Sequence, residues 1–318
     1  MRLSALSPQL VGILAMSAAG AVFSGHDAIT KYLSERLPIG EIIFFRQLSS
    51  AVLLTAYIWA THGLGVVRPV MISGQVLRAF FFLASTVLIA ISVASLPLST
   101  ALAIIFSSPL LVAALSPLLL KEAVGPRRWL AIIVGFIGVL VIIRPGGAEF
   151  TWLLLIPVAA ASASALRDIT TRILHRTDGT YAILFWSNLV ILAATLLTWP
   201  FGWKEVSLSD AGFLILGGAL NTLAHFLTIT ALRHGDAALV TPFRYTALVW
   251  AALLGFTIWG DVPDDWTILG AMIIVVAGVY LVLREAQVRR KAAASDPVSY
   301  THLTLPTIQH WCRSRWGP

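Results

Sequence analysis

Ten apolar stretches of about 17 to 23 residues follow one another along this chain, with short connections between them. In lipid, only helices and closed barrels satisfy every backbone polar group, and a spanning helix needs about 20 largely apolar residues. The pattern predicts an all-α integral membrane protein. Its ten transmembrane helices would cover roughly residues 9–30, 39–60, 75–95, 99–120, 128–144, 151–171, 180–200, 211–232, 237–259 and 266–284.

Composition supports lipid as the solvent. Hydrophobic residues make up 58% of the 318 residues and charged residues only 12%, whereas soluble domains carry about 25% charged residues. The single cysteine, Cys312, excludes an intrachain disulfide and a cysteine-based metal site. We therefore expect a lipid bilayer as partner, and no nucleic acid, metal or other cofactor.

A repeat organises the chain. The segment AAGAVFSGHDAITKYL at 18–33 returns 141 residues later as AAASASALRDITTRIL, so that Asp27 matches Asp168 and Lys31 matches Arg172. Each acid precedes its base by four residues, which places both on one helix face and predicts a local acid–base contact. Further matches at offsets of 139 to 141 predict two five-helix units, 1–146 and 147–290.

Five is an odd number, so the second unit must enter the membrane from the opposite side to the first. This predicts a 5+5 inverted-topology repeat, which is typical of secondary transporters with a site between the halves. The alternative is a duplication that built only a structural bundle.

Basic residues predict the orientation. With the N-terminus inside, the inner segments hold 14 Lys and Arg and the outer segments hold 4. Cytoplasmic segments carry such an excess, so we expect both termini in the cytoplasm. Residues 291–318 would form a cytoplasmic tail. Its part 296–318 resembles the translation of a synthetic sequencing adapter, and we expect non-native read-through there; a native disordered tail is the alternative.

The chain resembles the EamA-domain type of the drug/metabolite transporter superfamily over about residues 1–290. The likeness rests on the ten-helix layout and on Asp27-Ala28-x-x-Lys31, Glu41-x-x-Phe44-Phe45-Arg46, Pro109-Leu110, Leu120-Lys121-Glu122, Gly135-x-x-Gly138-Val139, Pro242-Phe243-Arg244-Tyr245 and Gly260-Asp261. The resemblance implies solute movement by alternating access across a bacterial inner membrane, through a central cavity lined by the first four helices of each half. The halves differ in one respect, because Ser187 stands where the first half has Arg46.

Two arginines fall deep within predicted helices. A guanidinium at mid-helix costs about 2.5–3.5 kcal/mol to insert, and Arg46 and Arg244 lie too deep to reach the interface easily. We predict that they line an aqueous cavity and bind an anionic group. Burial against an acid or against backbone carbonyls is the alternative.

Other polar and aromatic side chains at depth complete the predicted substrate site. An aromatic platform could stack on a planar or cationic solute, although core packing is the alternative. Polar residues at depth could bind solute, or could only join helices by hydrogen bonds. His225 is also the candidate for a pH-sensitive step. These predicted substrate-binding residues are Tyr245, Trp186, Trp250, Asn188, Asn221 and His225.

The repeated acids and bases lie at predicted helix ends. They could act as opposing gates whose ion pairs form and break during transport, or they could anchor the helices at the interface. The predicted gating residues are Asp27, Lys31, Asp168 and Arg172. Proton coupling usually needs a carboxylate in the membrane core, and we expect acids only at helix ends, so facilitated diffusion or exchange stays open as a mechanism.

These features favour a secondary transporter of a small polar metabolite, such as an amino acid or its derivative. The alternative substrate is a drug or a nucleoside-like metabolite, since some members of the resembled family take up S-adenosylmethionine. A membrane enzyme is disfavoured because the chain has neither H-E-x-x-H nor G-x-S-x-G. A scaffold or receptor without flux is the alternative from another class, and a homodimer is one option for assembly.

Overall fold

The computed structural model describes residues 7–122, 124–147, 150–175 and 177–295; the segment 296–318, interpreted above as read-through, lies outside them. Every regular element within these ranges is a helix. The α-helices are α1 (Pro8–Ser34), α2 (Ile39–Thr61), α3 (Ile72–Ser95), α4 (Leu98–Ile105), α5 (Ser108–Leu119), α6 (Pro126–Ile143), α7 (Leu155–Leu174), α8 (Thr180–Leu196), α9 (Leu208–His234), α10 (Ala237–Val240), α11 (Thr246–Trp259) and α12 (Asp265–Ser295).

Eight helical segments of the described chain are long and apolar enough to cross a membrane, and α8 is a shorter apolar helix. The all-helical prediction therefore holds, whereas two of the ten predicted spans, 180–200 and 237–259, contain no continuous helix of that length. The predicted span 237–259 is divided into α10, the 3-10 helix η5 (Thr241–Tyr245) and α11. Pro242 has no N–H to donate, which explains why a continuous α-helix stops there.

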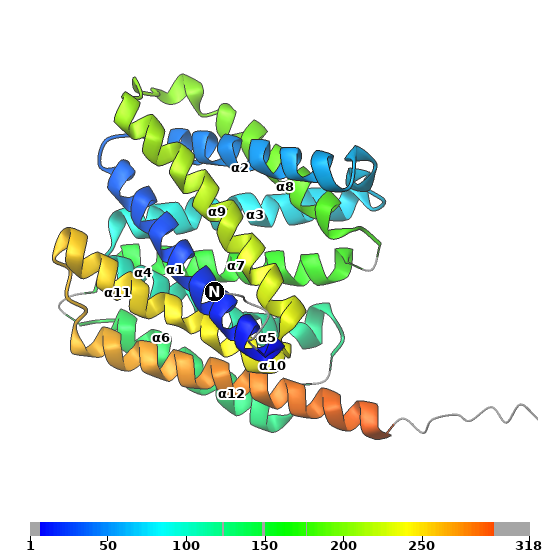
Figure 1. The fold of residues 1–318 in the computed structure, drawn as a ribbon. Coiled ribbons are helices and arrows are strands. Elements are labelled where there is room, and N and C mark those ends of the chain that lie inside the picture. Colours follow the sequence, from blue (N-terminus) through cyan, green and yellow to red (C-terminus); the bar gives the residue numbers. More distant parts are fainter. Residues whose placement is uncertain (1–6, 123, 148–149, 176, 296–318) are drawn as a thin grey trace, which may run out of the picture.

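The helices run in alternating directions between two ends of the molecule (Figure 1). We call the end that holds residues 35–38, 96–97 and 260–264 the Lys31 end, on the left of Figure 1. The end that holds 62–71, 120–122 and 177–179 is the Asp178 end, on the right. Both the start of α1 and the end of α12 lie toward the Asp178 end.

Helix contacts follow a matched pattern. α1 packs on α9 and α7 packs on α3, while α2 contacts α8 and α9, and α3 contacts α8. α6 packs against α12, away from the other helices' shared interior. A Cβ built at Gly138 would lie 2.9 Å from the carbonyl oxygen of Gly270, so glycine permits this close crossing.

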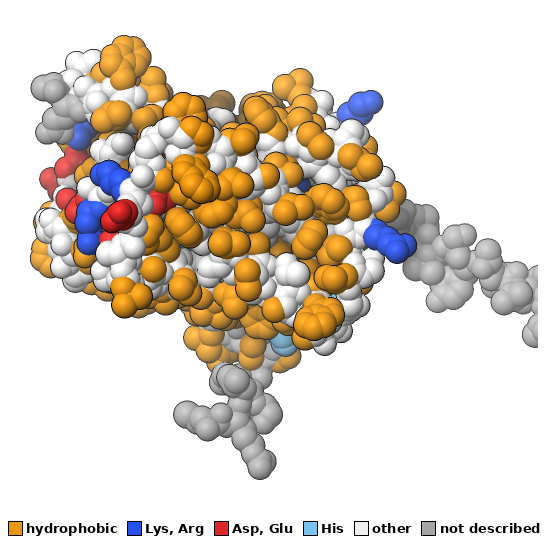
Figure 2. Space-filling model, turned by 90° about the horizontal axis from the view of Figure 1, so that it is seen from above, with side chains coloured by type: hydrophobic (Ala, Val, Ile, Leu, Met, Phe, Trp, Pro, Cys, Tyr) orange, Lys and Arg blue, Asp and Glu red, His pale blue; other side chains and the backbone are white. Residues whose placement is uncertain are grey.

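The surface fits a membrane. Figure 2 shows apolar side chains across the middle of one face, with charged side chains gathered at the two opposite edges. Several tryptophans near helix ends are exposed, as in an aromatic belt at the membrane interface: Trp59, Trp129, Trp152, Trp199 and Trp266.

Candidate functional site

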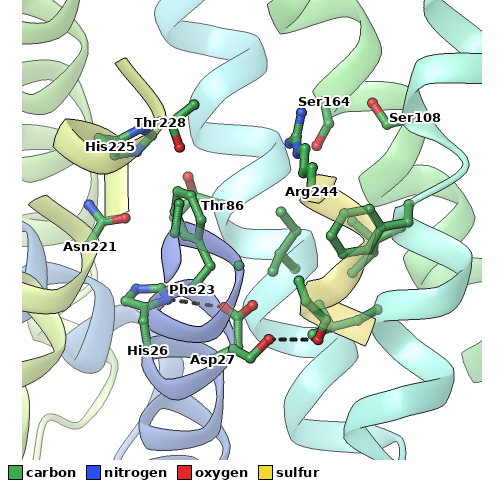
Figure 3. A pocket seen from close by; sticks show the side chains of 18 of the residues that line it. Phe23, His26, Asp27, Thr86, Ser108, Ser164, Asn221, His225, Thr228 and Arg244 are labelled. Carbon is green, nitrogen blue, oxygen red and sulfur yellow. Dashed lines mark hydrogen bonds and ion pairs between the residues drawn. The ribbon is translucent and has the colours of Figure 1, made fainter. Parts of the chain in front are cut away.

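A cavity of about 340 Å³ lies between the two halves of the chain. Residues from α1, α2, α3, α4, α5, α7, α9, η5 and α11 line it. Figure 3 shows Asn221 and His225 from α9 on one side, Arg244 and Ser164 on another, and His26 with Asp27 from α1. Its volume falls in the lower part of the roughly 300–1,000 Å³ range of small-molecule sites.

Arg46 reaches the cavity from α2 and is almost completely buried. Its Nη1 donates to Thr30 Oγ1 at 2.9 Å, and its Nε has no hydrogen-bond partner among the described residues. Gln47 Nε2, on the next residue, is also buried without a partner there. Two donors that line the cavity are thus left for a ligand that accepts hydrogen bonds.

His26 and Asp27 form a polar pair on the cavity wall. His26 Nδ1 lies 3.1 Å from Asp27 Oδ1, and His26 Nε2 is buried with no partner in the described chain. Only 13% of the Asp27 side chain is exposed. The expectation that acids lie only at helix ends is therefore wrong, because α1 continues to Ser34 and places Asp27 one to two turns within it.

Asp168 lines the same cavity from α7, beside Arg167. Arg167 Nε and Nη2 donate to Asp168 Oδ1 at 2.9 and 2.8 Å. Arg244 comes from η5, and its Cζ lies 5.9 Å from the centre of the Phe106 ring. The cavity therefore combines two acids with three arginines and with aromatic rings of Phe23, Phe82 and Phe106.

Six of the twelve predicted site residues line this cavity: Arg46, Arg244, Asn221, His225, Asp27 and Asp168. The His225 ring packs edge-on against Phe23, with centroids 5.2 Å apart. Sequence reasoning did not select His26, Thr30, Gln47 or Arg167 as substrate-binding residues, although all four line the cavity. The neighbouring acids at Asp27 and Asp168 were the only signal for His26 and Arg167.

The other predicted substrate residues lie elsewhere. Trp250 is 41% exposed on the outer surface, and Trp186 donates from Nε1 to the Val67 carbonyl at 2.9 Å. Tyr245 is buried and lines a separate apolar groove beside α12, where its hydroxyl has no hydrogen-bond partner within the described residues. Asn188 is buried in α8 and does not line the cavity.

The acid–base contacts differ from those predicted within each repeat copy. Lys31 Nζ lies 3.2 Å from Asp261 Oδ2 and donates to the Leu96 carbonyl at 2.9 Å, whereas Asp27 contacts His26. Arg172 lies 4.0 Å from Glu122, whereas Asp168 contacts Arg167. The i,i+4 spacing put each pair on one face, but each acid contacts its preceding neighbour on the same helix, and each base contacts an acid in a distant connection.

Comparison with known proteins decides the family. The model of the EamA-like transporter family matches the chain twice, at residues 10–144 and 150–284. The chain belongs to the EamA-like transporter family. This confirms the likeness to the EamA-domain type of the drug/metabolite transporter superfamily.

Its relatives carry different small metabolites. The chain is 30% identical to an S-adenosylmethionine uptake transporter of Rickettsia bellii over 84% of this chain and 92% of that one. It is 29% identical to a pseudopaline exporter of Pseudomonas aeruginosa, over 85% and 95% of the two chains. It is 27% identical to a riboflavin transporter of Rhizobium johnstonii, over 90% and 96%.

A solved crystal structure of a protein shares the fold, with a TM-score of 0.61 and 17% identity over 89% of this chain and 98% of that chain. The apolar helices and the bacterial relatives together indicate a multi-pass inner-membrane transporter of small metabolites. All three named relatives are transporters, which suggests a protein without enzymatic activity.

Proposed function

We propose that this protein is a secondary transporter that moves a small polar metabolite, an amino acid or its derivative, by alternating access. The observation that carries the proposal is the set of buried polar atoms without partners among the described residues, Arg46 Nε, Gln47 Nε2 and His26 Nε2, all on the wall of one cavity. Buried polar groups are almost always hydrogen-bonded, so such a cluster fits a site that a solute completes.

The charges of the cavity favour a zwitterionic solute. Arg46 and Arg244 can bind a carboxylate, while Asp27 and Asp168 can bind an ammonium group. An amino acid or a derivative carries both groups. The predicted roles of Arg46, Arg244, Asn221 and His225 in substrate binding thus become part of this proposal.

Alternating access would rest on a 5+5 inverted repeat, with residues 1–146 and 147–290 as its units. The matched contacts of α1 with α9 and of α7 with α3 support this arrangement. With the N-terminus inside, the Asp178 end faces the cytoplasm. On this orientation Lys31 belongs to an outer gate, and Asp168 and Arg172 belong to an inner gate.

A nucleoside-like metabolite is the second candidate. Phe23, Phe82 and Phe106 line the cavity and could stack on a planar base. The relative named as an S-adenosylmethionine uptake transporter supports this class, because that solute combines a zwitterion with a nucleoside.

Purified protein in liposomes tests both candidates. We expect saturable uptake of at least one radiolabelled solute from a panel of amino acids, S-adenosylmethionine, nucleosides and cationic drugs, with and without a pH gradient. Replacement Arg46→Ala should reduce this uptake roughly 30-fold, the loss of a charge-assisted hydrogen bond. Trp250→Ala, on the outer surface, serves as the matched control and should keep the wild-type rate.

No flux for any solute of the panel would contradict transport and favour the scaffold or receptor reading. Full flux in a well-folded Arg46→Ala protein would contradict the anion site. Uptake of S-adenosylmethionine without uptake of any amino acid would select the second candidate.

A further inference from the structure

A second buried arginine lies outside the cavity. Arg78 on α3 is only 6% exposed, although it lies near the start of that helix. Its Nε donates to Thr171 Oγ1 at 2.8 Å, and its Nη1 donates to the Ile183 carbonyl at 3.3 Å and to the Ser187 hydroxyl. Burying a guanidinium within a membrane-spanning helix is energetically costly, so its presence there indicates a specific role.

The contacts of Arg78 repeat those of Arg46. Arg46 donates to Thr30 on α1, and Arg78 donates to Thr171 on α7. Thr30 and Thr171 occupy equivalent positions in the two copies of the repeat, 141 residues apart. Thr30 lies four residues before the end of α1, and Thr171 lies three residues before the end of α7.

The two arginines come from non-equivalent helices. At the repeat offset of 141, Arg46 on α2 corresponds to Ser187 on α8. At the offset of 140, Arg78 on α3 corresponds to Gly218 on α9. Each interface therefore pairs one arginine with one small residue, α2 with α9 in one case and α3 with α8 in the other.

Packing explains why each interface holds only one arginine, opposite a small residue. A Cβ built at Gly218 would lie 2.5 Å from the Arg46 carbonyl oxygen, and one at Gly217 would lie 3.7 Å from Arg46 Cγ. Across the other interface, the Arg78 guanidinium reaches the Ser187 hydroxyl. A large side chain on both helices of either interface would overfill it.

Arg78 also touches the wall of the cavity from behind. The Phe82 ring, which lines the cavity, lies 5.4 Å from Arg78 Cζ and 5.7 Å from Arg167 Cζ. Arg167 in turn donates a hydrogen bond from Nε to Asp168 Oδ1. Arg78 is thus one residue removed from the cavity at the Asp178 end, whereas Arg46 meets it directly toward the Lys31 end.

We propose that Arg78, which lies in the first half on α3, is the positioning residue for α7 of the second half and is the counterpart there of Arg46, which contacts α1 from α2. Its guanidinium fixes α7 through Thr171 and supports the Phe82–Arg167–Asp168 wall that must close on the solute at the Asp178 end. This inference rests on the proposed function and adds to it a residue outside the cavity that sets the transport rate.

Relocation of the guanidinium tests the proposal. Five proteins are compared in liposomes with the solute that the wild type takes up best from the panel above: wild type, Arg78→Ala, Arg78→Lys, Ser187→Arg and the double variant Arg78→Ala/Ser187→Arg. Arg78→Ala should lower the maximal rate about tenfold and leave KM within about twofold, because Arg78 does not line the cavity. Ser187→Arg alone should also lower the maximal rate, because it would place two guanidinium groups in the interface between α3 and α8.

The double variant carries the arginine on α8 and the small residue on α3. This reproduces the α2–α9 interface, where the arginine is on α2 and the small residue is on α9. We expect it to regain at least about half of the wild-type rate. Arg78→Lys keeps the charge but loses the planar fork, and should give an intermediate rate. Elution as a single species and the thermal midpoint are measured for each variant to separate folding from rate.

Wild-type flux with a double variant no faster than Arg78→Ala would overturn this inference and leave the proposed function standing. A wild-type rate in a folded Arg78→Ala protein would overturn it as well. Absence of flux in the wild type would instead overturn the proposed function, and this inference with it.

Discussion

The two ends of the helix bundle are closed to different extents. At the Lys31 end, ion pairs join distant parts of the chain: Lys31 to Asp261 at 3.2 Å, Arg36 to Asp210 at 3.3 Å and Arg144 to Asp264 at 2.7 Å. At the Asp178 end, Arg172 and Glu122 are 4.0 Å apart, and both side chains are more than 40% exposed.

The cavity walls show the same difference. Toward the Lys31 end, the side chains of His26 and Asp27 are only 8% and 13% exposed. Toward the Asp178 end, the Asp168 side chain is 38% exposed and Arg244 is exposed. The comparison teaches that the cavity is enclosed more tightly toward the Lys31 end than toward the Asp178 end, an asymmetry that the proposed alternating-access cycle requires of each of its end states.

The largest effect should come from locking the closed end. With Cys312 replaced by serine, Lys31→Cys and Asp261→Cys joined by a short bis-maleimide should abolish flux, because the Lys31 end could no longer open. Uptake into liposomes before and after cross-linking measures this. Each single-cysteine variant, treated with the same reagent, is the control. Undiminished flux in fully cross-linked protein would show that this end need not open.

The second prediction concerns a carboxylate that ties the Asp178 end together. Asp178 accepts hydrogen bonds from the backbone N–H groups of Val70 and Met71, at 2.8 and 3.1 Å, and from Gln75 Nε2 at 3.0 Å. These bonds hold α3 against the turn between α7 and α8. Replacement Asp178→Ala should destabilise the protein by about 2 kcal/mol, measured by thermal unfolding in detergent.

The same carboxylate predicts a pH dependence. Burial alone would raise the pKa of Asp178, but the hydrogen bonds from Val70, Gln75, Thr177 and Met71 outweigh it and lower the pKa below its ordinary value. The stabilisation is therefore complete above the unfolded pKa of about 3.9 and is lost as the pH falls through the lower folded value. Asp178→Asn should remove this acid-side loss; an unchanged stability profile below about pH 4 would contradict the assignment.

The smallest effect compares single ion pairs at the two ends. Lys31→Ala breaks a partly buried pair and a hydrogen bond to the Leu96 carbonyl, and should destabilise the protein by about 1 kcal/mol. Arg172→Ala breaks an exposed, long pair and should cost less than about 0.5 kcal/mol. Thermal unfolding of both variants measures the difference, and equal costs would remove the contrast between the ends.

Sequence patterns predicted much of the architecture. Long apolar segments predicted the spanning helices, since a helix in lipid must supply about 20 apolar residues wherever it packs. The sequence did not predict that the span at Pro242 divides into α10, η5 and α11. A proline inside a membrane helix can also leave one continuous helix with a kink.

Site residues were predicted correctly where the depth of a polar side chain within an apolar segment was enough to identify it. Arg46, Arg244, Asn221 and His225 are polar residues in apolar segments, and all four line the cavity. Trp250 is equally deep along its helix but faces outward, because depth along a helix does not specify which side meets the cavity. The acids were misjudged for a related reason, since the span limits placed Asp27 too near a helix end.

By itself, the sequence determined a helical membrane protein of the EamA type with two related halves, because segment length, apolar content and internal repetition are local properties of the chain. Only the tertiary structure decided which charges meet. Lys31 and Asp261 are 230 residues apart, and Arg78 and Thr171 are 93 apart. The repeated acid–base spacing favoured partners four residues away, but helix packing brought Asp261, from the connection before α12, to Lys31, and this contact helps to close the Lys31 end.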